Sequence, residues 1–144
     1  MNGFMETFKI VAFTLGEEEY GMDIAYVQSI ERISPMTRIP NAPQYVKGVI
    51  NLRGSVMPII DLQNMLGTGE TQYTEETRVI ITKHDEIELG FIVDRTNDVL
   101  DVNPVEIEMT NSNNLDHDLF SGVVKHNGRL IILIKLTNLL QLNT

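Results

Sequence analysis

Residues 48–66 read GVINLRGSVMPIIDLQNML, and residues 122–140, which lie 74 positions later, read GVVKHNGRLIILIKLTNLL. Seven of the 19 aligned positions are identical and five more exchange one aliphatic residue or methionine for another. Unrelated segments of average composition would share about one identity. A weaker similarity relates residues 19–22 (EYGM) to residues 88–91 (ELGF). We interpret the chain as two related halves in tandem; the alternative is that two β hairpins look alike because sheets impose similar patterns.

Apolar residues recur with a period of two over many short segments that are bounded by turn residues. This pattern is typical of strands, and many strands at this spacing favour barrels or a sandwich. The expected strands are Phe8–Leu15, Tyr20–Ile24, Met57–Ile60, Arg78–Thr82, Leu89–Val93 and Leu130–Ile134. Short helices are expected at Asp61–Leu66 and Leu136–Leu142.

The repeat predicts a mainly β protein made of two small barrels within one domain, residues 1–144. The first barrel is expected at roughly residues 8–66 and the second at roughly 77–142, although the chain can cross between the halves. Residues 67–76 are small and polar and predict a linker. Because a half of about 70 residues has little core of its own, we expect the barrels to pack together.

The composition excludes several classes of protein. The chain has a net charge of −9 and no cysteine, so nucleic acid and anionic lipid would repel it and no disulfide forms. No stretch approaches the roughly 18 apolar residues of a membrane helix, and residues 1–9 lack the apolar run of a signal peptide. We therefore expect a cytoplasmic protein that neither binds nucleic acid nor inserts into membranes.

Motifs for catalysis are absent from the sequence. It contains no P-loop, no G-x-S-x-G elbow and no H-E-x-x-H zinc motif. The histidines, His84, His117 and His126, lie in polar, turn-like segments without metal-ligand spacing. Two of the twenty acidic residues could meet to perform acid–base chemistry, but no motif indicates it. We expect a protein that is not an enzyme and uses no metal or cofactor.

The two copies of the repeat differ at their hairpin tips. Residues 127–128 read Asn-Gly, the usual two-residue hairpin turn, whereas residues 53–54 read Arg-Gly. Leu52 precedes this arginine, and an apolar side chain beside a planar, multi-donor cation is typical of a protein-binding hot spot. The alternative is a surface arginine in a tolerant turn, with Leu52 in the core.

A second candidate surface is the segment 24–33. Apolar residues recur there every three positions, at Ile24, Val27, Ile30 and Ile33. The recurrence indicates a core-facing element, but Ser29, Glu31 and Arg32 interrupt it in the manner of a half-exposed edge. Prolines at positions 35 and 40 limit backbone pairing nearby.

Both surfaces lie in stretches that resemble the CheW-like family of bacterial chemotaxis proteins. The similarity is carried by residues 47–54 (KGVINLRG) and 58–62 (PIIDL), and also by residues 13–24, 37–43, 90–94 and 129–140. It extends over roughly Phe8 to Leu142. The resemblance implies two five-stranded SH3-like barrels around a shared apolar core, with short helices.

The resemblance also implies a function. Proteins of this family are non-catalytic adaptors that bind the cytoplasmic tips of chemoreceptors and the regulatory domain of the CheA histidine kinase. They form rings with that domain in receptor arrays at the membrane. The family's receptor contacts fall on Val27, Gly48 and Arg53, with Leu52 beside them, and we expect kinase contacts at Ile30 and Ile33.

Three residues depart from the family's pattern. Ser29 stands where glutamate is common, Arg78 where some members are aliphatic, and Glu108 where some relatives are basic. These changes affect the expected partner specificity and ring contacts. Two alternative functions stay open: a CheW-like domain of a CheV-type protein, whose receiver does not fit in 144 residues, and a small-molecule-binding β module.

Overall fold

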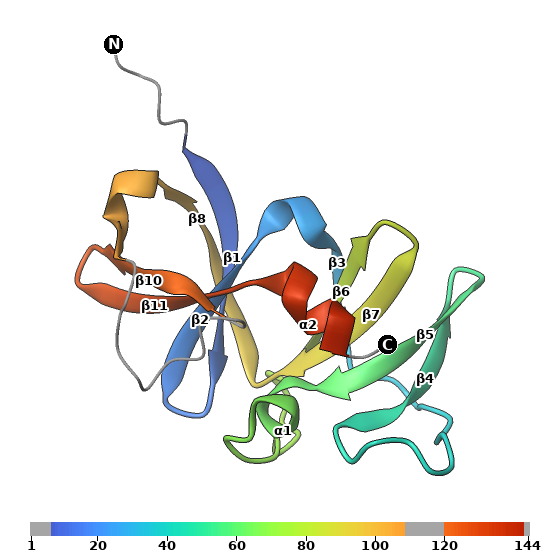
Figure 1. Cartoon of the computed structure of the whole chain (residues 1–144). Coiled ribbons are helices and arrows are strands. Elements are labelled where there is room, and N and C mark those ends of the chain that lie inside the picture. The colour runs from blue at the N-terminus through green and yellow to red at the C-terminus, as the bar shows by residue number, and fades with distance from the viewer. Residues whose placement is uncertain (1–6, 109–119, 143–144) are drawn as a thin grey trace. The chain divides into compact units, whose positions relative to one another are not determined.

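The computed structural model describes residues 7–108 and 120–142. The described chain divides into two compact units, each built on one β-sheet (Figure 1). The terminal unit contains residues 7–13, 17–25, 97–108 and 120–142, and the central unit contains residues 14–16 and 26–96. Each unit is described by itself below.

The sheet of the terminal unit has six strands in the order β8-β1-β2-β11-β10-β9. The strands are β1 (Phe8–Leu15), β2 (Glu18–Asp23), β8 (Arg95–Val102), β9 (Ile107–Glu108), β10 (Phe120–His126) and β11 (Arg129–Ile134). The helix α2 (Leu136–Leu142) follows β11, and the 3-10 turn η2 (Pro104–Glu106) lies between β8 and β9. Strand β11 runs parallel to β2 and antiparallel to β10.

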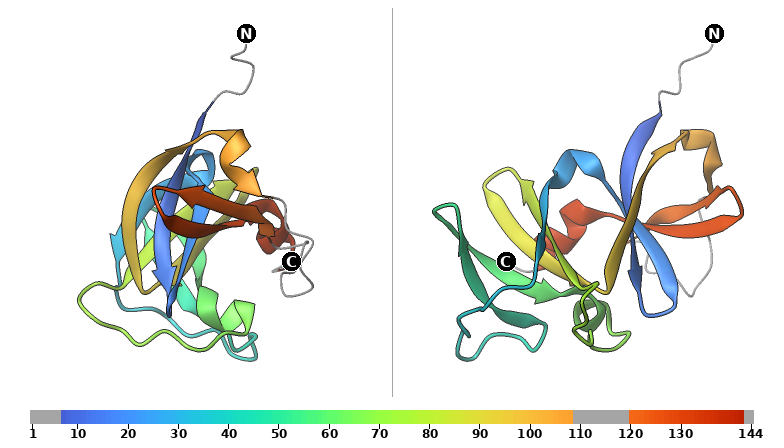
Figure 2. Two further views of the ribbon diagram at one scale, coloured as in Figure 1. Left: turned by 90° about the vertical axis from the view of Figure 1, so that its left-hand side faces the viewer. Right: turned by 180° about the vertical axis from the view of Figure 1, so that it is seen from behind.

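The sheet of the central unit has five strands in the order β3-β6-β7-β5-β4. The strands are β3 (Val27–Arg32), β4 (Val46–Leu52), β5 (Ser55–Asp61), β6 (Arg78–His84) and β7 (Ile87–Val93), with the 3-10 turn η1 (Ile24–Tyr26) before β3 and the helix α1 (Leu62–Leu66) after β5. The chain after β3 returns to β4 through a bridge between Thr37 and Val49. This bridge brings the two ends of the sheet together as a barrel. Figure 2 shows the twisted β4–β5 hairpin from two further sides.

The two sheets share one plan, which supports the duplication. The order β8-β1-β2-β11-β10 corresponds strand by strand to β3-β6-β7-β5-β4, and β9 lies where the Thr37 bridge lies. In each sheet the parallel pair contains a glycine, Gly21 opposite Leu133 and Gly90 opposite Ile59. A Cβ on Gly21 or Gly90 would lie 2.8 or 2.6 Å from an isoleucine Cδ1 atom, so a side chain at either position would force that isoleucine to move.

The first hairpin of each half belongs to the sheet of the other half. Strands β1 and β2 join the sheet that contains β11, whereas β6 and β7 join the sheet that contains β5. The sheets therefore divide the chain differently from the expected barrels at 8–66 and 77–142, and the chain crosses between the halves. Sequence periodicity does not distinguish these arrangements, because a hairpin has the same pattern whichever strand it joins.

Each unit has an apolar core from alternate strand residues. The central core consists of Met57, Ile59, Val79, Ile81 and Ile92, and the terminal core consists of Ile10, Val102, Val124, Ile131 and Leu133. Burying each of these side chains contributes roughly 1.5–3 kcal/mol. The mainly β architecture of two barrels with short helices is confirmed, and the expected strands and helices are found with each end within two residues of its predicted position.

Candidate partner-binding surface

The β4–β5 hairpin ends in a two-residue turn. Leu52 pairs with Ser55, and the residues between them have positive φ angles, 52° at Arg53 and 88° at Gly54. Two positive φ angles define a type I′ turn, in which the first position favours asparagine. The corresponding turn, residues 127–128, has asparagine there at the same φ of 52°. Arg53 therefore occupies a backbone position that disfavours it.

The side chain of Arg53, at the tip of the β4–β5 hairpin, approaches β3, which lies at the opposite end of the strand order. It is 73% exposed, and its Nη2 atom lies 3.6 Å from Oε2 of Glu31 on β3. The hairpin tip and β3, two segments that the sequence predicted separately as binding surfaces, are thus brought together. The predicted receptor contacts Val27 and Arg53 lie on these two segments.

Strand β3 presents different residues on its two faces. Ser29 and Glu31 are half-buried and pair with Ile81 and Val79, so they lie on the side of the central core. Ile30, the predicted kinase contact, points to the opposite face and is 41% exposed. Val27 pairs with Thr82 and Ile30 with Ile80, two residues of one face of β6, so Val27 and Ile30 share one face of β3 and Glu31 lies on the other. The three-residue recurrence results from a 3-10 turn followed by a strand with an irregular register between Val27 and Ser29.

Two residues that were predicted to contact partners pack against the core instead. Ile33 and Leu52 are half-buried and pack against the central core together with Met36 and Ile50. The structure thus corresponds to the alternative interpretation of Leu52, with its side chain in the core beneath an exposed arginine. A polar substitution at either residue should act first on stability.

Gly48 allows the barrel to close. It is buried, and a Cβ there would lie 2.7 Å from the carbonyl oxygen of Thr37 and 2.9 Å from Cβ of Met36. Thr37 exchanges two backbone hydrogen bonds with the neighbouring Val49, of 3.0 and 2.8 Å. Gly122 has the same role in the terminal unit, where a Cβ would lie 2.6 Å from the carbonyl oxygen of Glu108.

Ser29, Arg78 and Glu108 are the residues that depart from the family's pattern, and the structure shows whether each has a polar partner. The Ser29 hydroxyl is buried without a hydrogen-bond partner among the described residues. Arg78 donates from Nη1 to the carbonyl oxygens of Glu75 and Thr77, both at 2.8 Å. Glu108 forms an ion pair with Lys125 at 2.9 Å. Arg78 and Glu108 thus have structural contacts of their own.

A buried polar network fixes the segment that was predicted as a linker. The carboxylate of Asp61 is fully buried and accepts hydrogen bonds from the backbone N–H and the hydroxyl of Thr71, at 2.9 and 2.8 Å. Gln63 donates to Thr71 Oγ1 and to Asp94. Asp94 in turn accepts from the backbone N–H of Gly16. Residues 67–76 are therefore anchored to the central unit, which their polar composition did not indicate.

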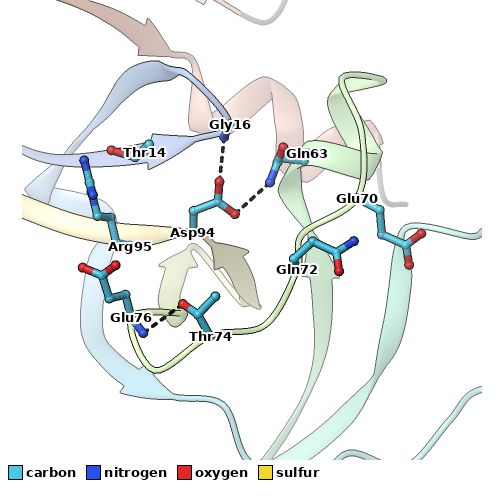
Figure 3. A pocket seen from close by; sticks show the side chains of 9 residues that line it. All are labelled: Thr14, Gly16, Gln63, Glu70, Gln72, Thr74, Glu76, Asp94 and Arg95. Atoms are coloured by element: carbon cyan, nitrogen blue, oxygen red, sulfur yellow. Dashed lines mark hydrogen bonds between the residues drawn. The ribbon is translucent and has the colours of Figure 1, made fainter.

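Figure 3 shows the hollow above this network, which measures about 420 Å³. Its lining residues are Thr14, Gly16, Gln63, Glu70, Gln72, Thr74, Glu76, Asp94 and Arg95. Gln63, the buried side chain of the lining, already donates to Asp94, which also accepts from the backbone N–H of Gly16. The hollow therefore gives no support to the small-molecule alternative.

Removing the carboxylate of Asp61 should destabilise the protein. We expect Asp61→Ala to lower the free energy of unfolding by roughly 1–3 kcal/mol, because the buried N–H of Thr71 loses its acceptor. Urea denaturation measures this change. Glu70→Ala is the matched control, since Glu70 is in the same segment but forms an exposed ion pair with Lys47. If Asp61→Ala is as stable as Glu70→Ala, the network does not anchor the segment.

The terminal unit has its own arginine at the corresponding hairpin. Arg129 donates to both Glu19 and Asp98, and Asp98 lies on β8, the counterpart of β3. These hydrogen bonds hold the pKa of each carboxyl below its ordinary value. In each barrel an arginine of the repeated hairpin therefore contacts a carboxylate on the corresponding strand, β3 or β8. Arg129 forms hydrogen bonds, whereas Arg53 approaches Glu31 only to 3.6 Å.

The described residues contain no group of three or more His, Asp or Glu side chains placed to hold a metal ion. His84 makes an edge contact with Tyr26, and His126 Nδ1 lies 3.2 Å from Glu106. His117 lies outside the described residues. Within the same part of the chain, no helix has the length and apolar character that crossing a membrane requires.

Comparison with known proteins identifies the class to which this fold belongs. The model of the CheW-like domain matches residues 9–143, and the chain belongs to that family. The chain is 41% identical to the chemotaxis protein CheW of Bacillus subtilis over 88% of its own length and 82% of that protein. It is 31% identical to CheW of Helicobacter pylori over 94% and 83% of the two chains.

A solved structure has the same fold. The scaffolding protein TtCheW from Thermoanaerobacter tengcongensis superposes with a TM-score of 0.83 at 35% identity, covering 90% of this chain and 89% of that one. The two-barrel, SH3-like expectation is confirmed by this likeness as well as by the sheets described above.

Proposed function

We propose that this protein is a non-catalytic chemotaxis adaptor that couples the cytoplasmic tips of chemoreceptors to the regulatory domain of a CheA-type histidine kinase. Its relatives are named chemotaxis proteins, and the solved neighbour is named a scaffolding protein. The adaptor acts in the cytoplasm and joins membrane receptor arrays through its partners. It performs no chemistry, and simultaneous binding raises the effective concentration of receptor and kinase for each other.

One observation carries this proposal above the others. An exposed arginine, Arg53, occupies a turn position that favours asparagine, and the corresponding position of the other barrel is asparagine. An arginine at such a position weakens the turn slightly, so its presence indicates selection for something other than folding. A planar cation with several donors on a protruding tip suits a protein partner. We assign this tip, with Val27 on β3, to the receptor.

The exposed side chain of Ile30 on β3 is assigned to the kinase. We expect Ile30→Glu to abolish saturable binding to the purified CheA regulatory domain, because a charge would replace an exposed apolar contact. Isothermal titration calorimetry measures this binding. Ile30 is 41% exposed, so the variant should keep the wild-type melting temperature.

Ile33→Glu provides the contrast for this experiment. Ile33 packs against the central core, so its replacement should lower the melting temperature as well as kinase binding. Wild-type affinity in Ile30→Glu would exclude Ile30 from the kinase contact. If the folded wild type gives no detectable heat with the regulatory domain at several temperatures, the adaptor function itself is contradicted.

A further inference from the structure

Glu31 gives Arg53 a partner within the same barrel. The closest approach of the two side chains, 3.6 Å, is an ion-pair distance but longer than a hydrogen bond. Arg53 is mostly exposed, whereas Glu31 is largely covered, with 27% of its side chain accessible. The pair is therefore a loose one, in which the guanidinium keeps donors available for another acceptor.

Glu31 is more buried than the arginine it faces. It lies within β3, in register with Val79 of β6, on the core side of the strand. Ser29, two residues before it on the same side, contributes only a hydroxyl without a hydrogen-bond partner among the described residues. In this chain the carboxylate that faces the hairpin tip thus comes from Glu31, and the arginine is the more exposed member of the pair.

We propose that Glu31 occupies Arg53 in the free protein and that a carboxylate of the receptor displaces it, so that Glu31 sets the affinity of the receptor site. The inference rests on the proposed function, because it assigns regulation to the same arginine. Because the group displaced from Arg53 is the carboxylate of Glu31, we expect the receptor group that replaces it to be a carboxylate as well. A guanidinium that leaves one carboxylate is best satisfied by another, which it can bind with two parallel hydrogen bonds.

Two effects of Glu31 act in the same direction. It competes with the receptor for Arg53, and its negative charge repels an approaching receptor carboxylate. Both effects weaken receptor binding, and both disappear when the charge is removed. Because exposed ion pairs are weak and screened by salt, the gain should be modest and should shrink at high ionic strength.

The test is Glu31→Gln, which keeps the size of the side chain and removes its charge. We expect the variant to bind a soluble receptor-tip fragment about two- to fivefold more tightly than the wild type at low salt, with a smaller difference at high salt. Asp85→Asn is the matched control. It removes the same charge from a β6–β7 turn position of positive φ, which asparagine tolerates.

A second measurement examines the free protein without any partner. Nuclear magnetic resonance relaxation of the Arg53 Nε–H group should show greater mobility in Glu31→Gln than in Asp85→Asn. If the wild type binds through Arg53 but Glu31→Gln binds no more tightly than Asp85→Asn, the inference is overturned and the adaptor function stands. If the folded wild type does not bind the receptor fragment, both are overturned.

Discussion

An Arg53→Asn variant should lose receptor binding without losing stability. Affinity for the receptor-tip fragment is expected to fall by roughly 1–3 kcal/mol, or about five- to 150-fold, if the guanidinium is a contact of the kind that dominates interfaces. The turn itself should tolerate the change, because asparagine occupies the same position, with the same φ of 52°, at residue 127. Calorimetric titration and thermal unfolding measure the two quantities.

Asparagine is a sharper choice than alanine at this position. Alanine at this positive φ would keep the strain that Arg53 already has, so the turn would be as weak as in the wild type. Asparagine relieves strain and should raise the free energy of unfolding by up to about 1 kcal/mol. Kinase-domain binding, which we assign to Ile30, should be unchanged. Equal losses of receptor and kinase binding, or a lower melting temperature, would show that Arg53 is a structural residue.

Much of the fold could be predicted from the repeat and from strand periodicity. The 19-residue repeat corresponds in the structure to β4–β5–α1 and β10–β11–α2, and the similar residues 19–22 and 88–91 form corresponding strands. These features are local, because turn residues and alternation determine them within one hairpin. Strand β8 was missed, since its sequence RTNDVLDV is polar and most of its residues are exposed.

The exchange of hairpins between the halves could not be predicted from the sequence. Which strand lies next to β2 or β7 depends on long-range pairing, and the two candidate partners, β11 and β5, have nearly the same sequence pattern. The same limit applies to the network around Asp61. A carboxylate at the start of a short helix indicates a cap, but its bonds run to Thr71, ten residues away.

The candidate site was predicted in its residues but not in its geometry. Arg53 was recognisable because the other copy of the repeat has asparagine at the corresponding position. Its proximity to Glu31 depends on closure of the barrel, which no local pattern encodes. The three-residue recurrence also did not separate Ile30 from Ile33, because Ile30 lies within β3 with its side chain exposed, whereas Ile33 follows the strand and packs on the core.

Gly48→Ala should destabilise the protein more than the same substitution at Gly54, the other glycine of the β4–β5 hairpin. The new Cβ would lie 2.7 Å from the backbone oxygen of Thr37, and backbone cannot give way as a flexible side chain can. Relief requires the Thr37–Val49 bridge to open, which separates the ends of the central sheet. We expect a loss of roughly 1–3 kcal/mol in the free energy of unfolding, measured by urea denaturation.

Gly54→Ala and Gly122→Ala distinguish crowding from backbone strain. Gly54 has positive φ but nothing within 4 Å of a Cβ, so its variant reports strain alone. Gly122 has the same crowding as Gly48 in the terminal unit, at 2.6 Å from Glu108, and should lose a similar amount of stability. In Gly48→Ala, the fraction of protein that binds the receptor fragment should equal the fraction that is folded. If binding is lost while the melting temperature is unchanged, Gly48 is instead a direct receptor contact, as the family resemblance implies.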